Sequence, residues 1–343
     1  MKRISMKKLV DFGVSFMTRR GVPTAKARHI AKVAVDAEAF RLSTHGIVQY
    51  SVIHENLGKS ISPKKETRTL RDYGAVAVLD AEGCFPVLAM KKAADMAVRK
   101  ASKYGIGMIT VRNSGWIAAL STHILPLAQR GFAVTAWAQS SRCRDCAPYG
   151  GIDACFSTNP IAVAFPTAGD PVVADFSTAT MSMGSAHEMI GRRERGRVPR
   201  FLDRRGRPTT DPSVIDRGGS LMFMGCEADG HKGYALSLFN EALTVMAGGS
   251  ANHPGRPGRQ TFGLTVIDPR RFGGKAYYVR EMKRFLARVK AIRPRLGMGR
   301  VRLPGERGQA TLKGCQTRGV PLTDEKVGML ASIARANRIA EPW

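Results

Sequence analysis

The segment Arg41-Leu42-Ser43-Thr44-His45-Gly46 places a hydroxyl, an imidazole and a glycine side by side between two helical patterns. Apolar residues recur at helical spacing before it, in residues 24–42, and after it, in residues 47–57, so both flanks are predicted to be amphipathic helices. If Gly46 ends the first helix, His45 lies at its C-terminal end, where the helix dipole favours the protonated imidazole. His45 is therefore a candidate proton donor. A helix cap that carries a solvated histidine is the alternative.

Further polar side chains follow predicted strands. A strand at 107–111 runs into Arg112-Asn113-Ser114-Gly115-Trp116 and then into a helix at 117–130. A second strand, 132–137, leads to a polar loop and to Gly150 and Gly151, which permit close backbone approach to a ligand. Strands at 161–165 and 171–176 precede Ser177 and Thr178. Hydroxyls at a strand end suit phosphate or ribose binding, and they are also ordinary turn residues.

The segment Gly230-His231-Lys232-Gly233-Tyr234 opens the most hydrophobic helical pattern of the chain. A lysine at the start of a buried helix opposes the helix dipole and needs a negatively charged partner. An anionic ligand would be such a partner.

The remaining elements follow from periodicity and from turn signals. Helical patterns dominate residues 5–58 and recur at 85–104 and 278–289, and a capped final helix begins at Thr323. Short extended runs lie at 66–80 and 261–267, and 248–258 is a loop with glycine and proline. The chain contains no GxGxxG between a strand and a helix and no GxxxxGK[ST], so neither a Rossmann nor a P-loop site is predicted.

Composition favours an α/β protein of two domains, because 343 residues with 43% hydrophobic and 24% charged residues include 36 glycines and few aromatics. The formal net charge is +27. The basic residues are spread along the chain, and the densest run, Arg192 to Arg207, has eight arginines but one aromatic residue, Phe201. A solvated loop that attracts anions and steers a charged substrate is favoured over nucleic-acid binding, since no zinc-finger or RNA-platform motif is present.

Six cysteines in a chain of this length do not make a disulfide framework, which indicates a reducing compartment. Cys143 and Cys146 form one CxxC with Cys155 nearby, and ordinary thiols are favoured over a zinc site; no metal is predicted. Residues 1–20 are predicted to be the first amphipathic helix rather than a signal peptide. No apolar run is long enough to span a bilayer, so a soluble, cytoplasmic protein without membrane partners is expected.

Seven motifs, in their order and approximate spacing from about residue 5 onward, resemble those of the type-2 malate/L-lactate dehydrogenase family. That family includes sulfolactate, ureidoglycolate and diketogulonate oxidoreductases and the reductases of cyclic imino acids. The motifs are Ser43-Thr44-His45-Gly46, Val111-Arg112-Asn113-Ser114, Pro148-Tyr149-Gly150-Gly151, Thr158-Asn159-Pro160-Ile161-Ala162, Asp175-Phe176-Ser177-Thr178, Gly230-His231-Lys232-Gly233-Tyr234 and Leu303-Pro304-Gly305-Glu306.

The resemblance implies an NAD- or NADP-dependent oxidoreductase that acts on a small 2-oxo or 2-hydroxy acid or on a cyclic imino acid. It also implies an α/β fold distinct from Rossmann, with a mixed, largely antiparallel sheet and a helical domain built from both termini. Residues 1–75 with 310–343 would form the helical substrate and dimer domain, and 76–309 the cofactor domain. A homodimer with its site at a domain and subunit boundary, and no specific nucleic-acid partner, is expected.

Carried over to this sequence, the resemblance implies His45 as the proton-transferring residue. Hydride transfer to a carbonyl or imine requires such a proton, and an acid with a pKa near neutrality suits it. The expected substrate-binding residues are Arg41, Thr44, Gln49, Tyr50, Arg112 and Trp116. The expected cofactor-binding residues are Ser140, Gly150, Gly151, Asn159, Asp175, Phe176, Ser177, Thr178, His231, Lys232, Pro304, Gly305 and Glu306.

Two departures from the family pattern bear on the substrate. Trp116 stands where the family commonly has a second histidine, and Gln49 where it often has an arginine that grips the substrate carboxylate. Arg41 or Arg112 could replace that arginine, whereas His123, two turns further along a helix, is disfavoured as a replacement imidazole. The departures leave open a cofactor-binding protein that has lost catalysis. Arg307 is a candidate for an NADP 2′-phosphate, and an ordinary surface arginine explains it equally well.

Overall fold

A seven-stranded sheet forms the centre of the molecule in the computed structural model, which describes residues 2–252 and 259–343. The strand order is β2 (Arg68–Tyr73), β3 (Val76–Asp80), β4 (Ile106–Ser114), β11 (Gln260–Ile267), β5 (Ala133–Ser140), β6 (Ile161–Phe165) and β7 (Val172–Phe176). β3 and β4 pair in parallel, and the other neighbours pair antiparallel. The predicted α/β fold with a mixed, largely antiparallel sheet is confirmed.

Two helices, α4 (Pro86–Tyr104) and α5 (Ser121–Gln129), pack on one face of this sheet. Alternate residues of the central strands point toward them, such as Val111 of β4 and Leu264 of β11, and are fully buried. Pro86 begins α4 and Gly105 ends it in the left-handed region, as local signals predict. The helix predicted at 117–130 begins only at Ser121, because Ala118 has a positive φ of 64°.

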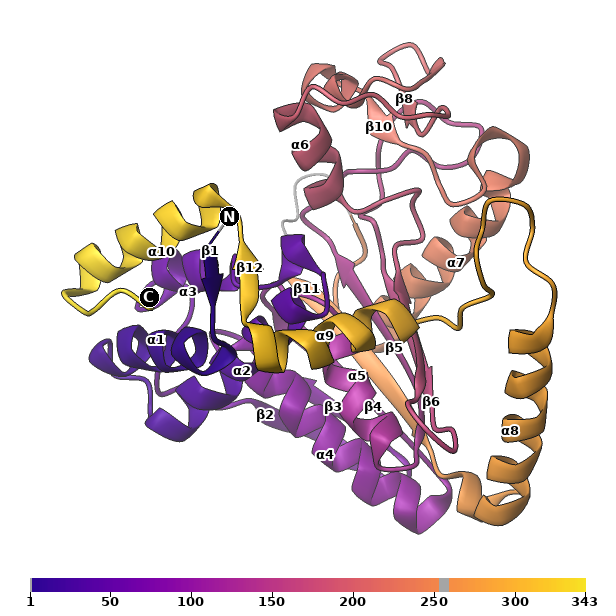
Figure 1. Cartoon of the computed structure of the whole chain (residues 1–343), viewed down its shortest axis with the longest axis horizontal. Helices are drawn as coiled ribbons and strands as arrows, with labels where there is room; N and C mark the ends of the chain where they lie inside the picture. Colours follow the sequence, from indigo (N-terminus) through magenta and orange to yellow (C-terminus); the bar gives the residue numbers. More distant parts are fainter. Residues whose placement is uncertain (1, 253–258) are drawn as a thin grey trace.

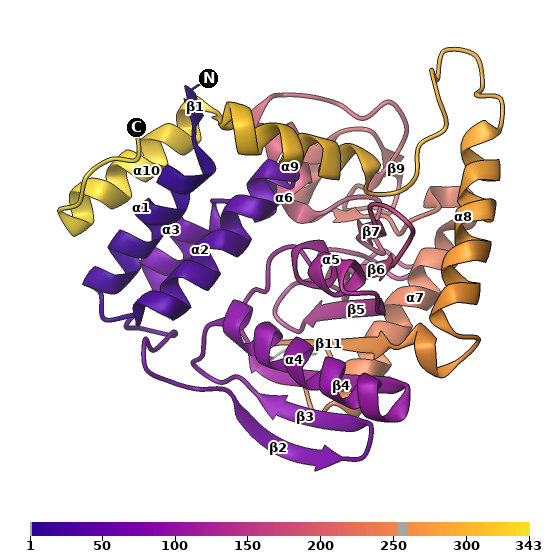
Figure 2. The same cartoon turned by 60° about the horizontal axis from the view of Figure 1, so that its bottom comes forward.

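Both chain ends build a separate helical unit (Figure 1). It contains α1 (Met6–Arg19), α2 (Thr24–Ala39), α3 (Gln49–Asn56) and α10 (Asp324–Asn337), and a short sheet in which β1 (Lys2–Ile4) pairs antiparallel with β12 (Val320–Leu322). α9 (Glu306–Arg318) connects this unit to the sheet (Figures 1 and 2). Strand β2 belongs to the sheet although it lies within residues 1–75. The division into two domains stays a prediction.

Residues 183–221, here called the arm, form a third, smaller unit (Figure 1). It contains α6 (Met183–Gly191), the short strands β8 (Phe201–Leu202), β9 (Pro208–Thr209) and β10 (Ser220–Leu221), and a 3-10 helix, η2 (Pro212–Arg217). Phe201 and Leu221 are fully buried in a small core. The solvated loop predicted at Arg192 to Arg207 is largely exposed as expected, and the buried Phe201 of β8 anchors it to the small sheet.

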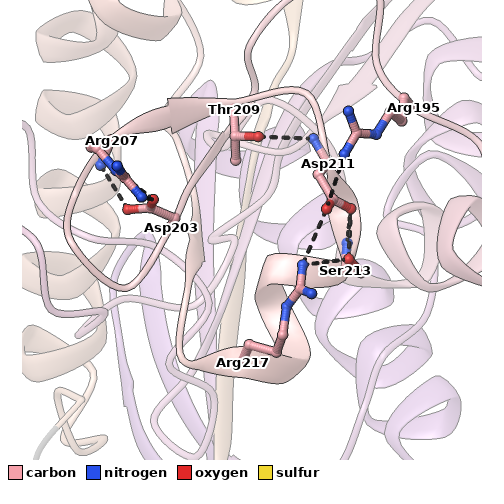
Figure 3. Close-up of polar contacts among 7 residues, drawn as sticks. All are labelled: Arg195, Asp203, Arg207, Thr209, Asp211, Ser213 and Arg217. Carbon is pink, nitrogen blue, oxygen red and sulfur yellow. Dashed lines mark hydrogen bonds and ion pairs between the residues drawn. The ribbon is translucent and has the colours of Figure 1, made fainter.

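Aspartates offset part of the positive charge of the arm (Figure 3). Asp211 lies 3.4 Å from the Arg195 guanidinium and 3.1 Å from that of Arg217, and Asp203 lies 2.8 Å from Arg207. The hydroxyl and the backbone N–H of Ser213 both donate hydrogen bonds to the Asp211 carboxylate, and these bonds help to lower the pKa of Asp211. These exposed pairs hold the loops together more than they stabilise the whole fold.

Helix α7 (Cys226–Met246) lies on the other face of the sheet with its polar side inward. Ser237, Asn240 and Thr244 are buried, whereas Phe239 and Met246 are 59% and 64% exposed. The sequence-based prediction of a helix buried through its apolar residues is therefore wrong, because small polar side chains face the sheet and apolar ones face outward.

The outermost helix is α8 (Lys275–Ala291), which lies along one side of the molecule (Figures 1 and 2). The short helices η1 (Ser43–His45) and η3 (Pro269–Arg271) complete the elements. The loop predicted at 248–258 lies in part outside the described residues. None of the helices described here is both long and apolar enough to cross a membrane.

Candidate active site

His45 ends the short helix η1, in a turn of residues 41–46 between α2 and α3 that is here called the His45 turn. Its Nδ1 shares a hydrogen bond of 2.8 Å with Thr44 Oγ1, and its ring lies 5.4 Å from the ring of Trp116. The Gln49 amide donates to the His45 carbonyl over 2.8 Å. These contacts fix both the orientation of the imidazole and the nitrogen that stays available to a ligand.

An ion pair between Glu38 and Lys326 supports the His45 turn. Lys326 Nζ donates to Glu38 Oε1 at 2.6 Å and to the Ser43 carbonyl at 2.8 Å, while the other oxygen of Glu38 accepts from Ile47 N–H at 3.1 Å. Gly46 is required here because a Cβ would overlap the Glu38 carboxylate. The turn is thus held by an ion pair from α2 and α10.

The expected protonation state of His45 needs correction. α2 ends at Ala39, Gly46 has a negative φ of −86°, and the left-handed residue is Arg41, with φ 72°. His45 is therefore not at the end of a long helix dipole, and burial lowers its pKa below the usual 6.5. The imidazole is predominantly neutral at pH 7, which suits a proton acceptor as well as a donor near its lowered pKa.

The arm reaches the His45 turn through α6. A Cβ on Gly184 would lie 2.9 Å from Thr44 Cβ, and the Ser43 hydroxyl donates to Glu188 over 3.2 Å. The arm therefore packs directly against the two residues that precede His45.

A first cavity of about 450 Å³, here called the apolar cavity, lies between the helical unit and the end of the sheet. Three of the predicted site residues, Gln49, Trp116 and Ser140, line it together. Its lining cations are Arg142 and Arg259, two residues that the sequence analysis did not single out. The full lining is Ile30, Gln49, Val52, Ile53, Asn56, Ser60, Ile61, Cys84, Phe85, Pro86, Val87, Ser114, Gly115, Trp116, Ser140, Arg142, Cys143, Arg259 and Gln260.

A second cavity of about 500 Å³, here called the arginine cavity, lies beside the ends of β7 and α9. It joins five predicted residues, Arg41, Asp175, Phe176, Pro304 and Gly305. The other residues that line it are Phe40, Leu42, Ser121, Val173, Ala174, Arg302, Leu303, Arg307 and Gly308.

Positive charge and helix N-termini converge on the arginine cavity. Arg41, Arg302 and Arg307 line it, and none of the three forms an ion pair with a residue that the structure describes. Helix α5 begins at Ser121, whose N–H donates to Asp175 over 2.8 Å, and α9 begins directly after Gly305. Helix N-termini and guanidinium groups both favour anions such as phosphates.

The His45 turn joins the two cavities. Arg41 and Leu42, at its start, line the arginine cavity, while Gln49, just after it, lines the apolar cavity. Trp116 lines the apolar cavity and touches the His45 ring from the other side. His45 itself lines neither cavity, but its ring neighbour Trp116 lines the apolar one and its turn reaches the arginine cavity through Arg41 and Leu42.

Several predicted substrate residues serve the fold instead. Tyr50 is fully buried and its hydroxyl donates to the carbonyl of Leu9 over 3.0 Å, so its expected contact with substrate is corrected to a core position. Arg112 Nε donates to Asp80 at 3.3 Å, and Arg112 Nη1 donates to the Gly248 carbonyl at 3.3 Å. Its guanidinium is engaged within the fold.

The predicted cofactor residues after β5 and β7 are also engaged by the chain. Asn159 is fully buried, and its amide donates to Ser237 Oγ at 2.9 Å and to Glu241 at 3.0 Å. The hydroxyls of Ser177 and Thr178 both donate to the Thr158 carbonyl at 3.0 Å. The Asn159 bonds anchor the segment before β6 on α7, and the two hydroxyls tie the end of β7 to the same segment.

Gly150 and Gly151 lie in an exposed turn and line neither cavity. His231 packs edge-on against Tyr149, with 5.7 Å between the ring centres. Lys232 lies in the second turn of α7, and Asp229 supplies its negative partner at 2.7 Å. In the sequence analysis, Lys232 is inferred to need an anionic ligand as its partner. This inference is corrected, because Asp229 is that partner.

Glu306 holds the turn that precedes its own helix. Its Oε2 accepts from Leu303 N–H at 3.0 Å, and Arg300 lies 3.1 Å from Oε1. The Leu303 N–H is the main cause that lowers the pKa of Glu306.

His123 is buried in α5, where desolvation lowers its pKa to about 4. All six cysteines are free thiols; Cys143 lines the apolar cavity and Cys146 is fully buried.

The chain builds its two cavities around a mixed sheet and lacks the Rossmann glycine fingerprint between a strand and a helix. A family model described as malate/L-lactate dehydrogenase matches residues 4–331. The chain belongs to this family, which confirms the resemblance seen in the sequence, and it is therefore an oxidoreductase of the kind that acts on CH–OH or C=N groups.

Individual relatives agree. The chain is 31% identical over 95% of its length to a Δ1-pyrroline-2-carboxylate/Δ1-piperideine-2-carboxylate reductase of Pseudomonas putida, also covering 95% of that protein. It is 27% identical to a malate dehydrogenase of Pyrococcus abyssi, covering 97% of this chain and 94% of the relative. A malate dehydrogenase structure from Entamoeba histolytica superposes with a TM-score of 0.92 at 21% identity, covering 100% and 99% of the two chains. That last likeness concerns the fold alone.

Proposed function

We propose that this protein transfers hydride between NAD(P)H and the carbonyl or imine carbon of a small 2-oxo acid or cyclic imino acid, with His45 exchanging the accompanying proton. The observation that carries the proposal is that the His45 ring lies 5.4 Å from Trp116, which lines the apolar cavity, in a turn whose Arg41 and Leu42 line the arginine cavity. A bound nicotinamide supplies the hydride, and the protein must position the two reactants and manage the proton.

The arginine cavity fits the phosphates of a dinucleotide. Two helix N-termini and the guanidinium groups of Arg41, Arg302 and Arg307 face one volume, and together they balance several negative charges. Gly305 suits a close approach, since its φ of 82° is one that other residues rarely adopt. Asp175, held by Ser121 N–H, is placed to accept a hydrogen bond from a ribose hydroxyl.

His45 acts as acid in reduction and as base in oxidation. Thr44 Oγ1 engages Nδ1, which leaves Nε2 for the substrate oxygen or nitrogen. Burial keeps the imidazole neutral at pH 7, so it is ready to accept a proton from a hydroxy acid. In the direction of reduction it must first gain a proton, which its lowered pKa makes harder at pH 7, so mildly acidic pH favours this direction.

Arg142 and Arg259 take the role of the carboxylate-binding arginine that is common in the family and whose position is occupied by Gln49 in this chain. Both line the apolar cavity on the side of the sheet, next to Ser140, where a substrate carboxylate can pair with them. The Ser114 hydroxyl is buried in the same lining and has no hydrogen-bond partner among the described residues, so it can serve a ligand.

We further propose that the protein acts as a homodimer in a reducing compartment such as the cytoplasm. Leu236, Phe239, Val245 and Met246 of α7 are 37% to 64% exposed on one helix, and contiguous apolar surface of this kind is typical of subunit contacts. Free thiols throughout the chain favour the reducing compartment.

The test is a spectrophotometric assay at 340 nm, with NADH and NADPH in turn, on pyruvate, oxaloacetate, phenylpyruvate and Δ1-piperideine-2-carboxylate. His45→Ala should lower kcat/KM by about 10²- to 10⁴-fold, while NAD(P)H binding stays near wild type, because a positioned acid or base contributes that much. His54→Ala on α3 is the matched control, since His54 lines neither cavity. Wild-type protein inactive on all four substrates, or a fully active His45→Ala, would refute the proposal.

A second candidate is a cofactor-binding protein without catalysis, which Trp116 favours because an indole exchanges no proton. Calorimetry that shows NAD(P)H binding, together with no turnover of any substrate above, would select it.

A further inference from the structure

The apolar cavity offers a hydrophobic lining that the small side chain of lactate and the charged one of malate do not use. We propose that it selects a 2-oxo acid, or the corresponding 2-hydroxy acid, with a bulky apolar side chain, and that Val52 and Trp116 are determinants of this choice. The inference rests on the proposed function and names the substrate class for the same site.

The helical unit and the start of α4, which packs against it, supply an apolar wall. Val52 and Ile53 come from α3, Ile61 from the following turn, and Phe85 and Val87 from the start of α4. Ile53, Phe85 and Val87 are each less than a tenth exposed, so the wall is rigidly packed from behind. A ligand gains free energy from this wall only by placing carbon against it.

The two cations of the lining stand on the other side. Arg142 follows β5 and Arg259 immediately precedes β11, so both lie at the end of the sheet. A carboxylate held there directs the rest of the substrate toward the helical unit. One end of the cavity therefore binds charge and the other binds carbon.

Asn56 and Ser60, two of the polar residues on the helical side, already form hydrogen bonds within the chain. Asn56 Nδ2 donates to the Val52 carbonyl at 2.8 Å, and Asn56 Oδ1 accepts from Ser60 at 2.9 Å. No cation of the described chain lines this wall. A second carboxylate, as in oxaloacetate, would lose water there without gaining a partner, which costs free energy.

Trp116 extends the same surface toward His45. It lines the cavity, and its ring lies 5.4 Å from the imidazole. A flat indole beside the reacting carbon favours an aliphatic or aromatic side chain over a hydrated polar one. A volume of about 450 Å³ also lies in the range of cavities that hold ligands much larger than lactate.

The experiment compares kcat/KM for phenylpyruvate and 4-methyl-2-oxopentanoate with that for pyruvate, oxaloacetate and Δ1-piperideine-2-carboxylate. The apolar 2-oxo acids should lead by about tenfold or more, the selectivity that even one or two methylene groups confer. A lead for pyruvate, oxaloacetate or the cyclic imine overturns this inference and leaves the proposed function standing. Inactivity on all five substrates overturns the proposed function itself.

A charge placed in the wall makes the test specific. Val52→Lys should shift the phenylpyruvate-to-oxaloacetate ratio of kcat/KM by about 100-fold toward oxaloacetate, because the new cation meets the second carboxylate. Val14→Lys, the same change at a half-buried position of α1 outside both cavities, should leave the ratio at its wild-type value. A ratio does not depend on the fraction of folded protein, so a loss of stability cannot mimic the effect. An unchanged ratio in Val52→Lys overturns the inference.

Discussion

Lys326 offers the sharpest test of how the His45 turn is held. It comes from the final helix, yet its ammonium group joins Glu38 and the Ser43 carbonyl beneath the turn. Its side chain is 15% exposed and that of Glu38 is 6% exposed. Lys326→Met keeps much of the side chain and removes the charge and the donors, so it isolates the interaction from the packing.

The expected cost follows from the burial of the pair. Removing one partner of a buried ion pair leaves the other charge uncompensated and costs about 3 to 5 kcal/mol. Glu38 retains the hydrogen bond from Ile47 N–H, which favours the lower end, near 3 kcal/mol. In the double variant Glu38→Gln/Lys326→Met no buried charge remains, so about half of the loss should return.

Urea unfolding followed by circular dichroism at pH 7 measures these free energies, and kcat/KM on the best substrate reports the position of His45. Lys326→Met should lower kcat/KM about tenfold where the protein is still folded. Lys92→Met is the matched control, since Lys92 Nζ donates only to the Thr67 carbonyl, at 2.6 Å and away from the turn. A cost below about 1 kcal/mol for Lys326→Met, or a double variant no more stable than the single one, would refute the reasoning.

Three further predictions concern proton binding and the cofactor. Because burial lowers the pKa of His45, the kcat/KM for reduction should rise as pH falls from 8 toward 6, while oxidation should hold its rate above pH 7. His123 has a pKa of about 4 in the folded protein against 6.5 in the unfolded chain. As pH falls below 6.5 the unfolded chain therefore binds a proton at His123 that the folded protein does not, and the free energy of unfolding falls. His123→Gln should lose about 2 kcal/mol less unfolding free energy than wild type between pH 7 and pH 5, measured in urea. Gly305→Ala should weaken NADPH binding about tenfold in a fluorescence titration, because φ is 82° and the new Cβ would lie 2.7 Å from the Val173 carbonyl oxygen.

Each of these has a clear contrary result. A flat pH profile for reduction between 6 and 8 would remove His45 from the proton transfer. Equal acid sensitivity of His123→Gln and wild type would mean that His123 takes up its proton without cost. Unchanged NADPH affinity in Gly305→Ala would separate the start of α9 from the cofactor site.

Local signals explain what the sequence predicts well. The strand expected at 161–165 is Ile161–Phe165, and the helix expected at 85–104 is Pro86–Tyr104, because a proline opens that helix and Gly105 closes it. Thr323 caps the final helix by accepting from Lys326 N–H, as its residue type indicates. Motif order added the mixed sheet, which periodicity alone does not distinguish from other α/β arrangements.

Long-range pairs explain what the sequence did not reveal. Glu38 and Lys326 lie 288 residues apart, and no local pattern connects them. Arg142 and Arg259 lie among many similar arginines, so only the folded chain shows that they share one cavity. From the sequence, the helix that contains Lys232 is expected to begin at Gly230, so Asp229 is not considered as a partner of Lys232. The helix begins at Cys226 and contains both residues.

The pairing of β1 with β12 bears on how the chain is made in the cell. Phe12 and Phe16 share a core with Leu330, which is translated long after them. Until α10 has been made, helices α1 and α2 lack the partner that buries part of their apolar surface, and chaperones can bind that surface. The core of the helical unit should therefore become complete only after α10 has been made, so that its earliest segment waits longest for protection.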